Sequence, residues 1–347
     1  MKLLVVSNMY PSKEFPSYGV FVRNFVSQLE ELNIDYRLAV MHKARGKLQK
    51  LGGYVGFYLK SFFCSLFGRY DAVYVHYASH SSPGVLLARK FRKFTVYTNC
   101  HGSDVIPQNA GQERMQKNTR AIVGCSEKII VPSGYFMRVV TEKYAVDPEK
   151  VFVCASGGVD TSIFYPARNT QPPFTIGFVS RIEPGKGWKV LLEACEKLSG
   201  AYRLLMVGGG SEEEKLRRLV QQMGLTDHVE IAGAQPQQKL PDYLNRMDIF
   251  VFPTELKESL GLVAIEAMAC GCPVIASDFA APADYVVDGV NGYKFPVGDS
   301  VALTRLLDKM QSMPEQETAV LREGALATAR RYTRQQVTYT LEKILLE

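Results

Sequence analysis

The chain has 347 residues, of which 46% are hydrophobic and 22% are charged, a composition that excludes disordered and fibrous proteins and can fill two cores. The formal net charge of +6 is unevenly distributed. Residues 1–170 hold 22 Lys and Arg against 12 Asp and Glu, and residues 171–347 hold 19 against 23, so we expect the two halves to meet different partners.

Three features of the sequence bear on where the protein works. Its seven cysteines form no CxxC pair, which indicates reduced thiols in the cytoplasm rather than a disulfide framework. The first apolar run, residues 3–6, is too short for a signal peptide, so no export is expected. The longest apolar stretch, residues 51–67, is interrupted by Lys60 and falls short of the roughly 18 residues of a membrane span.

Short apolar runs alternate with longer segments of helical period along the whole chain. The runs predict strands at residues 3–6, 37–41, 72–76, 95–98, 129–131 and 151–154, and then at 175–179, 203–207, 229–232, 249–252 and 273–276. This alternation is typical of βαβ units, so the sequence predicts an α/β protein with parallel sheets.

A polar, proline-rich stretch at residues 165–173 cannot continue a helix or a central strand, and it is expected to link two domains. We therefore predict doubly wound, Rossmann-like domains at residues 1–165 and 172–331. Such sheets bind ligands at the carboxyl ends of their strands, so the cleft between the domains is the expected site. Amphipathic helices are predicted at residues 315–331 and 333–346.

The most informative segment is residues 253–277. Here a loop is expected to carry Glu258 and a helix to cover residues 259–271. Glu266 lies among apolar neighbours in that helix, so its carboxylate needs hydrogen bonds, which ribose or sugar hydroxyls would supply. The start of this helix offers free backbone N–H groups to a phosphate, and Gly261 would let that phosphate come close. A buried Lys or Arg paired with Glu266 is the structural alternative.

Two cations follow the strand predicted at residues 175–179. Arg181 and Lys186 would lie just beyond its carboxyl end, where a guanidinium and an ammonium group can hold a diphosphate. The lysine precedes Gly187 rather than Ser or Thr, so this segment is not a Walker A loop. A solvated turn is the alternative for Lys186.

Three further segments each allow two interpretations. Residues 207–211 place glycines between a strand and a helix, but Glu213 replaces the third glycine of the dinucleotide fingerprint, and a plain tight turn would suffice. Gly19 opens a helix and can bring backbone amides to a phosphate, although alone it is a weak signal. His101 follows the strand at residues 95–98 and can contact a sugar or move a proton, or it can be a capping or core histidine.

No metal site is expected from the sequence. It contains neither HExxH nor an Asp-x-Asp pair, and Cys270 and Cys272 have no histidine partners. A bound diphosphate would therefore have to be neutralised by Arg, Lys and helix ends.

In order and spacing, these segments resemble the retaining glycosyltransferases of family 4, the group 1 transferases with the GT-B fold. The resemblance rests on Ser-Arg-x4-Lys-Gly at residues 180–187, Val-Gly-Gly-Gly at 207–210, and Glu-x7-Glu with Ala-Met-Ala-Cys-Gly-x-Pro-Val-Ile-Ala-Ser at 258–277. It extends to residues 158–166 and 288–292. The resemblance also implies that the final helix, residues 332–347, crosses back to the first domain.

The resemblance implies a role for each candidate residue. For the donor diphosphate it implies Arg181, Lys186, Gly19, Gly261 and Leu262. For the nucleotide ribose it implies Glu266, and for catalysis at the transferred sugar it implies His101 and Glu258. It further implies an acceptor-binding N-terminal domain, a UDP- or GDP-type nucleotide sugar as co-substrate, no metal or other cofactor, and retention of anomeric configuration.

Residues 51–67 allow two interpretations that bear on the acceptor. Lys43, Arg45, Lys47 and Lys50 precede this aromatic-rich stretch, a pattern that suits docking on an anionic bilayer and access to a lipid-linked acceptor. An ordinary buried crossover helix behind a solvated basic loop fits the same residues.

The sequence thus predicts a glycosyltransferase that moves a sugar from a nucleoside-diphosphate sugar to an acceptor hydroxyl. Surface polysaccharide or glycolipid synthesis at the inner face of the cell membrane is the expected setting. The alternatives are a nucleotide-sugar epimerase or hydrolase of the same fold, and a non-catalytic nucleotide-sugar-binding subunit. No recognition module for nucleic acid accompanies the positive charge, so nucleic acid is not an expected partner.

Overall fold

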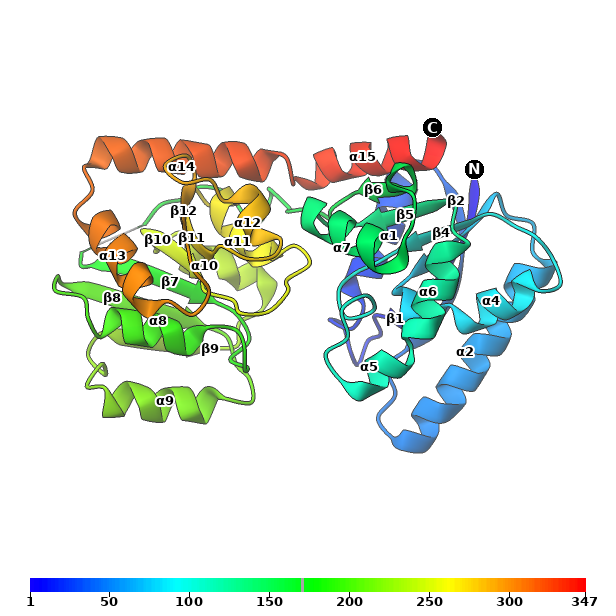
Figure 1. Ribbon diagram of the computed structural model, residues 1–347, viewed down its shortest axis with the longest axis horizontal. Helices are drawn as coiled ribbons and strands as arrows, with labels where there is room; N and C mark the ends of the chain where they lie inside the picture. Colours follow the sequence, from blue (N-terminus) through cyan, green and yellow to red (C-terminus); the bar gives the residue numbers. More distant parts are fainter. Residues whose placement is uncertain (170–171) are drawn as a thin grey trace. The chain divides into compact units, whose positions relative to one another are not determined.

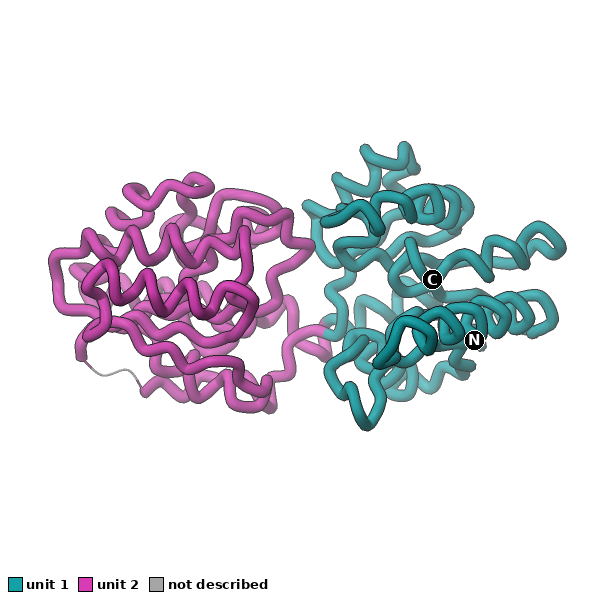
Figure 2. Tube along the Cα trace, turned by 90° about the horizontal axis from the view of Figure 1, so that it is seen from below, with its two compact units in different colours: residues 1–157, 337–347 teal, residues 158–336 magenta. Residues whose placement is uncertain are grey.

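Twelve strands in the described residues, 1–169 and 172–347 of a computed structural model, form two six-stranded sheets. Each sheet belongs to its own unit (Figure 2): unit 1 comprises Met1–Gly157 and Val337–Glu347, and unit 2 comprises Gly158–Gln336. All neighbouring strands run parallel. The predicted α/β class with two doubly wound parallel sheets is therefore confirmed.

The sheet of unit 1 has the strand order β2-β1-β3-β4-β5-β6. Its strands are β1 (Lys2–Tyr10), β2 (Asp35–His42), β3 (Ala72–His76), β4 (Val96–Asn99), β5 (Lys128–Val131) and β6 (Val151–Val153). The helices between them are α1 (Val20–Glu31), α2 (Lys47–Phe67), α3 (Ala78–Ser81), α4 (Pro83–Arg89), α5 (Ala110–Arg114), α6 (Gln116–Gly124) and α7 (Gly134–Tyr144). All of β3 and β4 is buried, as expected for interior strands of a sheet that is covered on both faces.

The sheet of unit 2 has the strand order β12-β11-β10-β7-β8-β9. Its strands are β7 (Phe174–Val179), β8 (Tyr202–Val207), β9 (Val229–Gly233), β10 (Ile249–Phe252), β11 (Val274–Ser277) and β12 (Gly292–Phe295). The helices are α8 (Trp188–Cys195), α9 (Glu213–Gln222), α10 (Leu240–Leu244), α11 (Leu262–Ala269), α12 (Pro282–Tyr285), α13 (Ser300–Gln311) and α14 (Glu315–Arg330), and α15 (Arg334–Leu346) follows (Figure 1). Apolar residues of β7, β8, β10 and α8 form much of its core.

All eleven predicted strands are present, and the structure adds β12. This edge strand has the sequence Gly-Tyr-Lys-Phe and pairs only with β11, so it lacks the continuous apolar run that marks the buried strands. The helix predicted over residues 259–271 begins later, at Leu262, because Gly261 adopts a left-handed conformation with φ +77°. The two units divide between Gly157 and Gly158, ahead of the predicted linker, of which residues 170 and 171 lie outside the described residues.

The last part of α15 belongs to unit 1 rather than to unit 2. The Nζ atom of Lys128 donates a hydrogen bond to the carbonyl oxygen of Ile344 at 2.5 Å, and Nε2 of Gln28 donates to Oγ1 of Thr338 at 3.0 Å. Four apolar residues of this part are buried: Val337, Leu341, Ile344 and Leu345. The chain therefore completes the packing of unit 1 after it has formed unit 2.

Leu341→Ala is expected to lower the stability of unit 1 by about 2–5 kcal/mol, the usual effect of truncating a buried leucine. Leu341 is 2% exposed, whereas Leu346 on the same helix is 55% exposed. Leu346→Ala is therefore the matched control, with an expected change within about 0.5 kcal/mol. Thermal denaturation of both variants measures the difference, and equal melting temperatures would contradict the packing of α15 described above.

Candidate active site

Six of the predicted site residues lie in unit 2, around the carboxyl ends of its strands, and two lie in unit 1. The six are Arg181, Lys186, Glu258, Gly261, Leu262 and Glu266, and the two are Gly19 and His101. In a doubly wound sheet this edge is where loops from neighbouring strands meet, which explains how residues far apart in the sequence come together.

The loop after β7 is pressed against the loop after β10, a neighbouring strand of the sheet. Gly187, which precedes α8, has φ +73°, and a Cβ atom at this position would collide with the carbonyl oxygen of Pro253. Only glycine meets both conditions. Glycine is thus required after Lys186 because the backbones of the two loops approach closely there. This approach brings Lys186 toward the loop after β10.

Lys186 and Glu258 form an ion pair across these two loops. The Nζ atom of Lys186 donates to Oε1 of Glu258 at 2.6 Å, and the two side chains are only 11% and 19% exposed. The hydroxyl of Thr254 donates to the same carboxylate oxygen at 3.3 Å. Lys186 is therefore not the solvated turn residue of the alternative interpretation, because its charge is largely removed from water and matched by a carboxylate.

Arg181 is arranged differently. Its side chain is 63% exposed, and its Nη1 atom lies 2.7 Å from the carboxylate of Glu183. An exposed ion pair of this kind contributes little free energy. Arg181 can therefore exchange Glu183 for an incoming anion at little cost.

Glu266 lies in α11 and is buried. It is 5% exposed, and its Oε1 atom accepts a hydrogen bond from Nε2 of Gln237 at 2.9 Å. Burial raises the pKa of Glu266 to about 7, although the hydrogen bond from Gln237 acts in the opposite direction. Within the described residues no basic side chain forms an ion pair with this carboxylate, so the predicted alternative of a buried Lys or Arg partner is wrong.

A hollow of about 330 Å³ joins Arg181 to Glu266. It is also lined by Gly208, Gly209 and Gln235, from the segments that follow β8 and β9. The glycine run after β8 is needed for packing, because a Cβ atom at Gly208 would collide with the carbonyl oxygen of Ser180. The hollow lies within unit 2, and its mixture of a cation, a buried carboxylate and exposed backbone suits a nucleotide.

The helix α11 begins beside these groups. Its N-terminal cap is Gly261, where a Cβ atom would lie 2.7 Å from the ring of Phe252, and the hydroxyl of Tyr285 donates to the carbonyl oxygen of Gly261 at 3.2 Å. Leu262 is the first helical residue. The free N–H groups of this first turn carry partial positive charge.

In unit 1, Gly19 caps α1 and His101 follows β4. Gly19 has φ +76°, and a Cβ atom there would lie 2.6 Å from the backbone of Met9, so the turn after β1 requires glycine. The ring of His101 packs on Phe21 with centroids 4.2 Å apart, and its Nε2 atom lies 3.0 Å from Nδ1 of His76. Burial lowers the pKa of His101 to about 3, so its imidazole is neutral at ordinary pH.

Four partners of the site residues were not identified from the sequence: His76, Thr254, Gln237 and Ser156. His76 carries the one available signal, since a histidine that closes an otherwise apolar strand is a polar group in a buried position. The other three are common polar residues, Thr254 and Ser156 in loops and Gln237 at the start of a short 3-10 helix, and nothing in their local sequence distinguishes them. In the described part of the chain, no group of three His, Cys, Asp or Glu residues is arranged to hold a metal ion.

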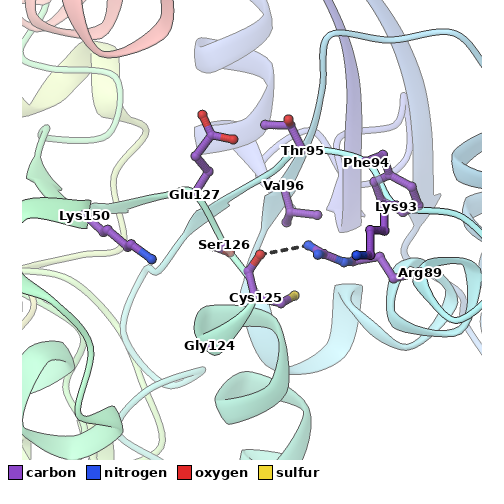
Figure 3. Close-up of a pocket in the computed structure, with 10 residues that line it drawn as sticks. All are labelled: Arg89, Lys93, Phe94, Thr95, Val96, Gly124, Cys125, Ser126, Glu127 and Lys150. Carbon is purple, nitrogen blue, oxygen red and sulfur yellow. Dashed lines mark hydrogen bonds between the residues drawn. The ribbon is translucent and has the colours of Figure 1, made fainter.

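A second hollow in unit 1, of about 480 Å³, contains none of the predicted site residues. It lies beside the amino ends of β4 and β5, and its charged lining residues are Arg89, Lys93, Glu127 and Lys150. Figure 3 shows Arg89 turned toward the carbonyl oxygen of Cys125, to which its Nη1 atom donates at 2.8 Å. This hollow lies at the opposite end of the strands from His101.

Two family models match this chain in succession. Residues 162–325 match the glycosyl transferases group 1, and residues 19–163 match Glycosyltransferase Family 4. The chain belongs to the group 1 glycosyltransferases of family 4.

The relatives and solved structures agree with this assignment. A D-inositol 3-phosphate glycosyltransferase from Acidothermus cellulolyticus is 26% identical over 296 residues, which cover 76% of this chain and 64% of that protein, somewhat less than two thirds of its length. The apo form of the lipopolysaccharide outer core galactosyltransferase WaaB has a TM-score of 0.76 at 17% identity and covers 99% of both chains. Anabaena HepE in complex with UDP-glucose has a TM-score of 0.74 at 18% identity over 99% of this chain and 98% of that one. At 17% and 18% sequence identity, the similarity to these two structures shows the fold alone, and that fold is GT-B.

Glu266→Gln is expected to stabilise the ligand-free protein at alkaline pH. The carboxyl has a pKa near 7 when folded and 4.5 in its ordinary state, so the folded protein loses stability as pH rises between these values. Glutamine removes that loss, which amounts to about 3 kcal/mol above pH 8 and becomes small at pH 5. Thermal melting at both pH values measures the effect. Glu213→Gln, at a partly exposed helix position paired with Arg217, is the control, and an equal gain in both variants would contradict the prediction.

Proposed function

We propose that this protein is a retaining glycosyltransferase that moves a sugar from a nucleoside-diphosphate sugar to an acceptor hydroxyl without a metal ion. The observation that carries this proposal is the buried carboxylate of Glu266, which faces a hollow shared with Arg181 and has no cation partner among the described residues. A carboxylate in that position satisfies its remaining hydrogen-bonding capacity with hydroxyl groups, which the ribose of a nucleotide provides.

The donor would lie across the unit 2 residues described above. The ribose hydroxyls would donate to Glu266, and the diphosphate would take its counter-charge from Arg181, Lys186 and the first amides of α11 at Gly261 and Leu262. These donors do the work that a divalent cation does in other transferases. Gly19 of unit 1 would add backbone amides to the diphosphate. Anabaena HepE, whose fold is similar, binds UDP-glucose, which favours a UDP-type donor.

The Lys186–Glu258 pair provides a site for the chemical step. In this arrangement Lys186 would stabilise the leaving diphosphate, which departs with the electron pair of the bond to the anomeric carbon. Glu258 would hold hydroxyls of the transferred sugar, and His101 would contact the same sugar from unit 1. The acceptor oxygen would then bond to the anomeric carbon on the face that the diphosphate left, and its proton would pass to the departing phosphate, so the configuration is retained.

Two other activities use the same donor site. An epimerase or hydrolase would isomerise or release the sugar without an acceptor, and a binding subunit would hold the nucleotide without turnover. Family membership favours transfer. WaaB, which shares the fold, is a lipopolysaccharide outer core galactosyltransferase, and this name supports a role in surface polysaccharide or glycolipid synthesis. Analysis of the products separates transfer from isomerisation and hydrolysis.

The donor site predicts that one nucleoside diphosphate raises the melting temperature of the protein by several degrees, because a ligand that binds only the folded state stabilises it. UDP and GDP, each with and without an attached sugar, form the panel, and EDTA is expected to leave the shift unchanged. A shift that EDTA abolishes would contradict metal-independent binding, and no shift with any nucleotide would contradict the site.

Single-residue variants test which side chains cause the rise in melting temperature on nucleotide binding. Lys186→Ala is expected to lose most of the shift, measured against its own ligand-free melting temperature, whereas Lys197→Ala, at an exposed position in the same unit, retains it. Glu258→Gln is expected to keep the nucleotide shift and to lose sugar transfer. An unchanged transfer rate in this variant would remove Glu258 from the mechanism.

We further propose that unit 1 docks on an anionic bilayer through the outer face of α2 and that its acceptor is lipid-linked. Six large apolar side chains of α2 are exposed at intervals of three or four residues: Leu48, Leu51, Val55, Leu59, Phe63 and Phe67. Such spacing aligns them on one face of the helix. An ordinary buried crossover helix would turn this face inward, yet α2 buries only Phe57, Ser61 and Ser65.

The surroundings of this apolar face also suit a bilayer. Phe91, which follows α4 and is 70% exposed, packs edge-on against Phe62 with ring centroids 6.1 Å apart, so the apolar surface continues from α2 to the neighbouring α4 (Figure 1). Exposed cations flank it: Lys43, Lys47, Lys50, Lys60 and Lys90. Apolar residues beside cations favour the interface of an anionic membrane. Among the described helices, none is both long and apolar enough to cross a membrane.

The triple variant Leu51→Glu, Leu59→Glu, Phe63→Glu is expected to bind phosphatidylglycerol vesicles at least about tenfold more weakly, since each large apolar side chain that enters the membrane contributes roughly 1.5 kcal/mol or more. Vesicle sedimentation measures this binding. The control replaces three exposed valines of unit 2, Val297, Val301 and Val320, with glutamate and is expected to bind as the wild type does. Equal binding by both triple variants would overturn the proposal.

A further inference from the structure

A pair of histidines lies at the carboxyl ends of two neighbouring strands in unit 1. His76 is the last residue of β3, and His101 follows β4. The Nδ1 atom of His76 is 3.0 Å from the Nε2 atom of His101, a distance that requires one of the two nitrogens to carry a proton and the other to accept it.

The surrounding residues hold both rings in place. The ring of His76 is 1% exposed and lies edge-on to Phe25 at 4.6 Å, and the ring of His101 packs on Phe21 at 4.2 Å. The buried carboxylate of Asp104 accepts hydrogen bonds from the backbone N–H of His101 and of Ala78, two residues after His76. One carboxylate therefore ties together the two segments that carry the histidines.

Burial also fixes the charge of the pair. It lowers the pKa of both imidazoles, that of His76 further through the neighbouring His101. The two rings are therefore neutral together, and the pair shares a single proton between Nδ1 of His76 and Nε2 of His101.

Two proton arrangements are compatible with this contact. If His101 donates from Nε2, both rings carry their proton on Nε2, which is the more stable tautomer of free neutral imidazole in histidine. If His76 donates from Nδ1 instead, both rings must adopt the less stable tautomer. The first arrangement is therefore favoured at both residues at once.

The far side of His76 can accommodate the Nε2–H proton of the first arrangement. A cavity of about 10 Å³, close to the space of one water molecule, is lined by His76 and Asn99. The Nε2 atom of His76 and the Oδ1 atom of Asn99 are both buried and have no partner among the described residues. A water molecule there would accept from Nε2–H and donate to Oδ1, so both atoms would be satisfied.

We propose that His76 is a positioning residue for His101: it accepts a hydrogen bond from Nε2–H of His101 and leaves Nδ1 of His101 as the unprotonated nitrogen. That nitrogen faces Ser156, whose hydroxyl is 3.4 Å away, and it is the atom that can accept a hydrogen bond from a sugar hydroxyl. The catalytic consequence rests on the proposed function, whereas the hydrogen bond itself does not.

The wild-type protein with 15N-labelled histidine tests the hydrogen bond directly. A 15N–15N coupling between His101 Nε2 and His76 Nδ1, with the shared proton bound to His101, is the expected result. The absence of this coupling, or a proton bound to Nδ1 of His76, would overturn the proposal. This measurement needs neither a variant nor a substrate.

Kinetics tests the positioning role. His76→Leu removes the acceptor and is expected to lower kcat by about tenfold, the effect of losing one orienting hydrogen bond, while the Kd for UDP is unchanged because the nucleotide binds elsewhere. His76→Asn, whose amide oxygen can accept near the position of Nδ1, is expected to recover most of kcat. Turnover is measured as UDP release from UDP-glucose.

His228 provides the matched control, since its ring stacks on Tyr202 at 4.7 Å much as that of His76 contacts Tyr74 at 4.9 Å. His228→Leu is expected to leave kcat unchanged. If His76→Leu also left kcat unchanged, or if His76→Asn fell as far as His76→Leu, the positioning role would be refuted. If the wild-type protein did not turn over UDP-glucose, the proposed donor would be contradicted. The 15N–15N coupling would then still test the hydrogen bond between His76 and His101.

Discussion

The site in unit 2 depends on how closely the loops after β7, β8 and β10 approach one another. Gly187 and Gly208 lie against carbonyl oxygens of adjacent loops, where any side chain would collide. These backbone contacts place Lys186 beside Glu258, a residue 72 positions later in the chain. The glycines are thus structural requirements of the site, and its charged side chains meet because the backbones beneath them are in contact.

The charged side chains at this edge of the sheet differ in whether they have a partner of opposite charge. Lys186 has a carboxylate partner, Arg181 has only an exposed one, and Glu266 has none among the described residues. Burying a carboxylate without a cation destabilises the folded protein, and such residues are typical of binding sites rather than of structural cores. Under the proposed function, the nucleotide sugar would supply both the hydroxyls and the anionic charge that these residues lack in the ligand-free protein.

Much of the fold could be predicted from the sequence, because buried parallel strands appear as uninterrupted apolar runs, and only the edge strand β12 lacked that signal. The motifs also gave the loops that carry Arg181, Lys186 and Glu258. What the sequence could not give was pairing across long separations, such as Gln237 with Glu266 or His76 with His101. It could not distinguish the inner from the outer face of α2 either, because that helix is apolar on most of its surface and only packing decides which residues stay exposed.

The discontinuity of unit 1 has a consequence for how the protein is made. Residues 337–347 complete its packing, yet the ribosome synthesises them after all of unit 2. Until these residues are made, the surface of unit 1 that packs against Val337 and Leu341 is exposed to water. Unit 1 therefore remains incompletely packed while unit 2 is synthesised and folds. Biosynthesis therefore reverses the usual order, in which the first domain to leave the ribosome is the first to finish folding.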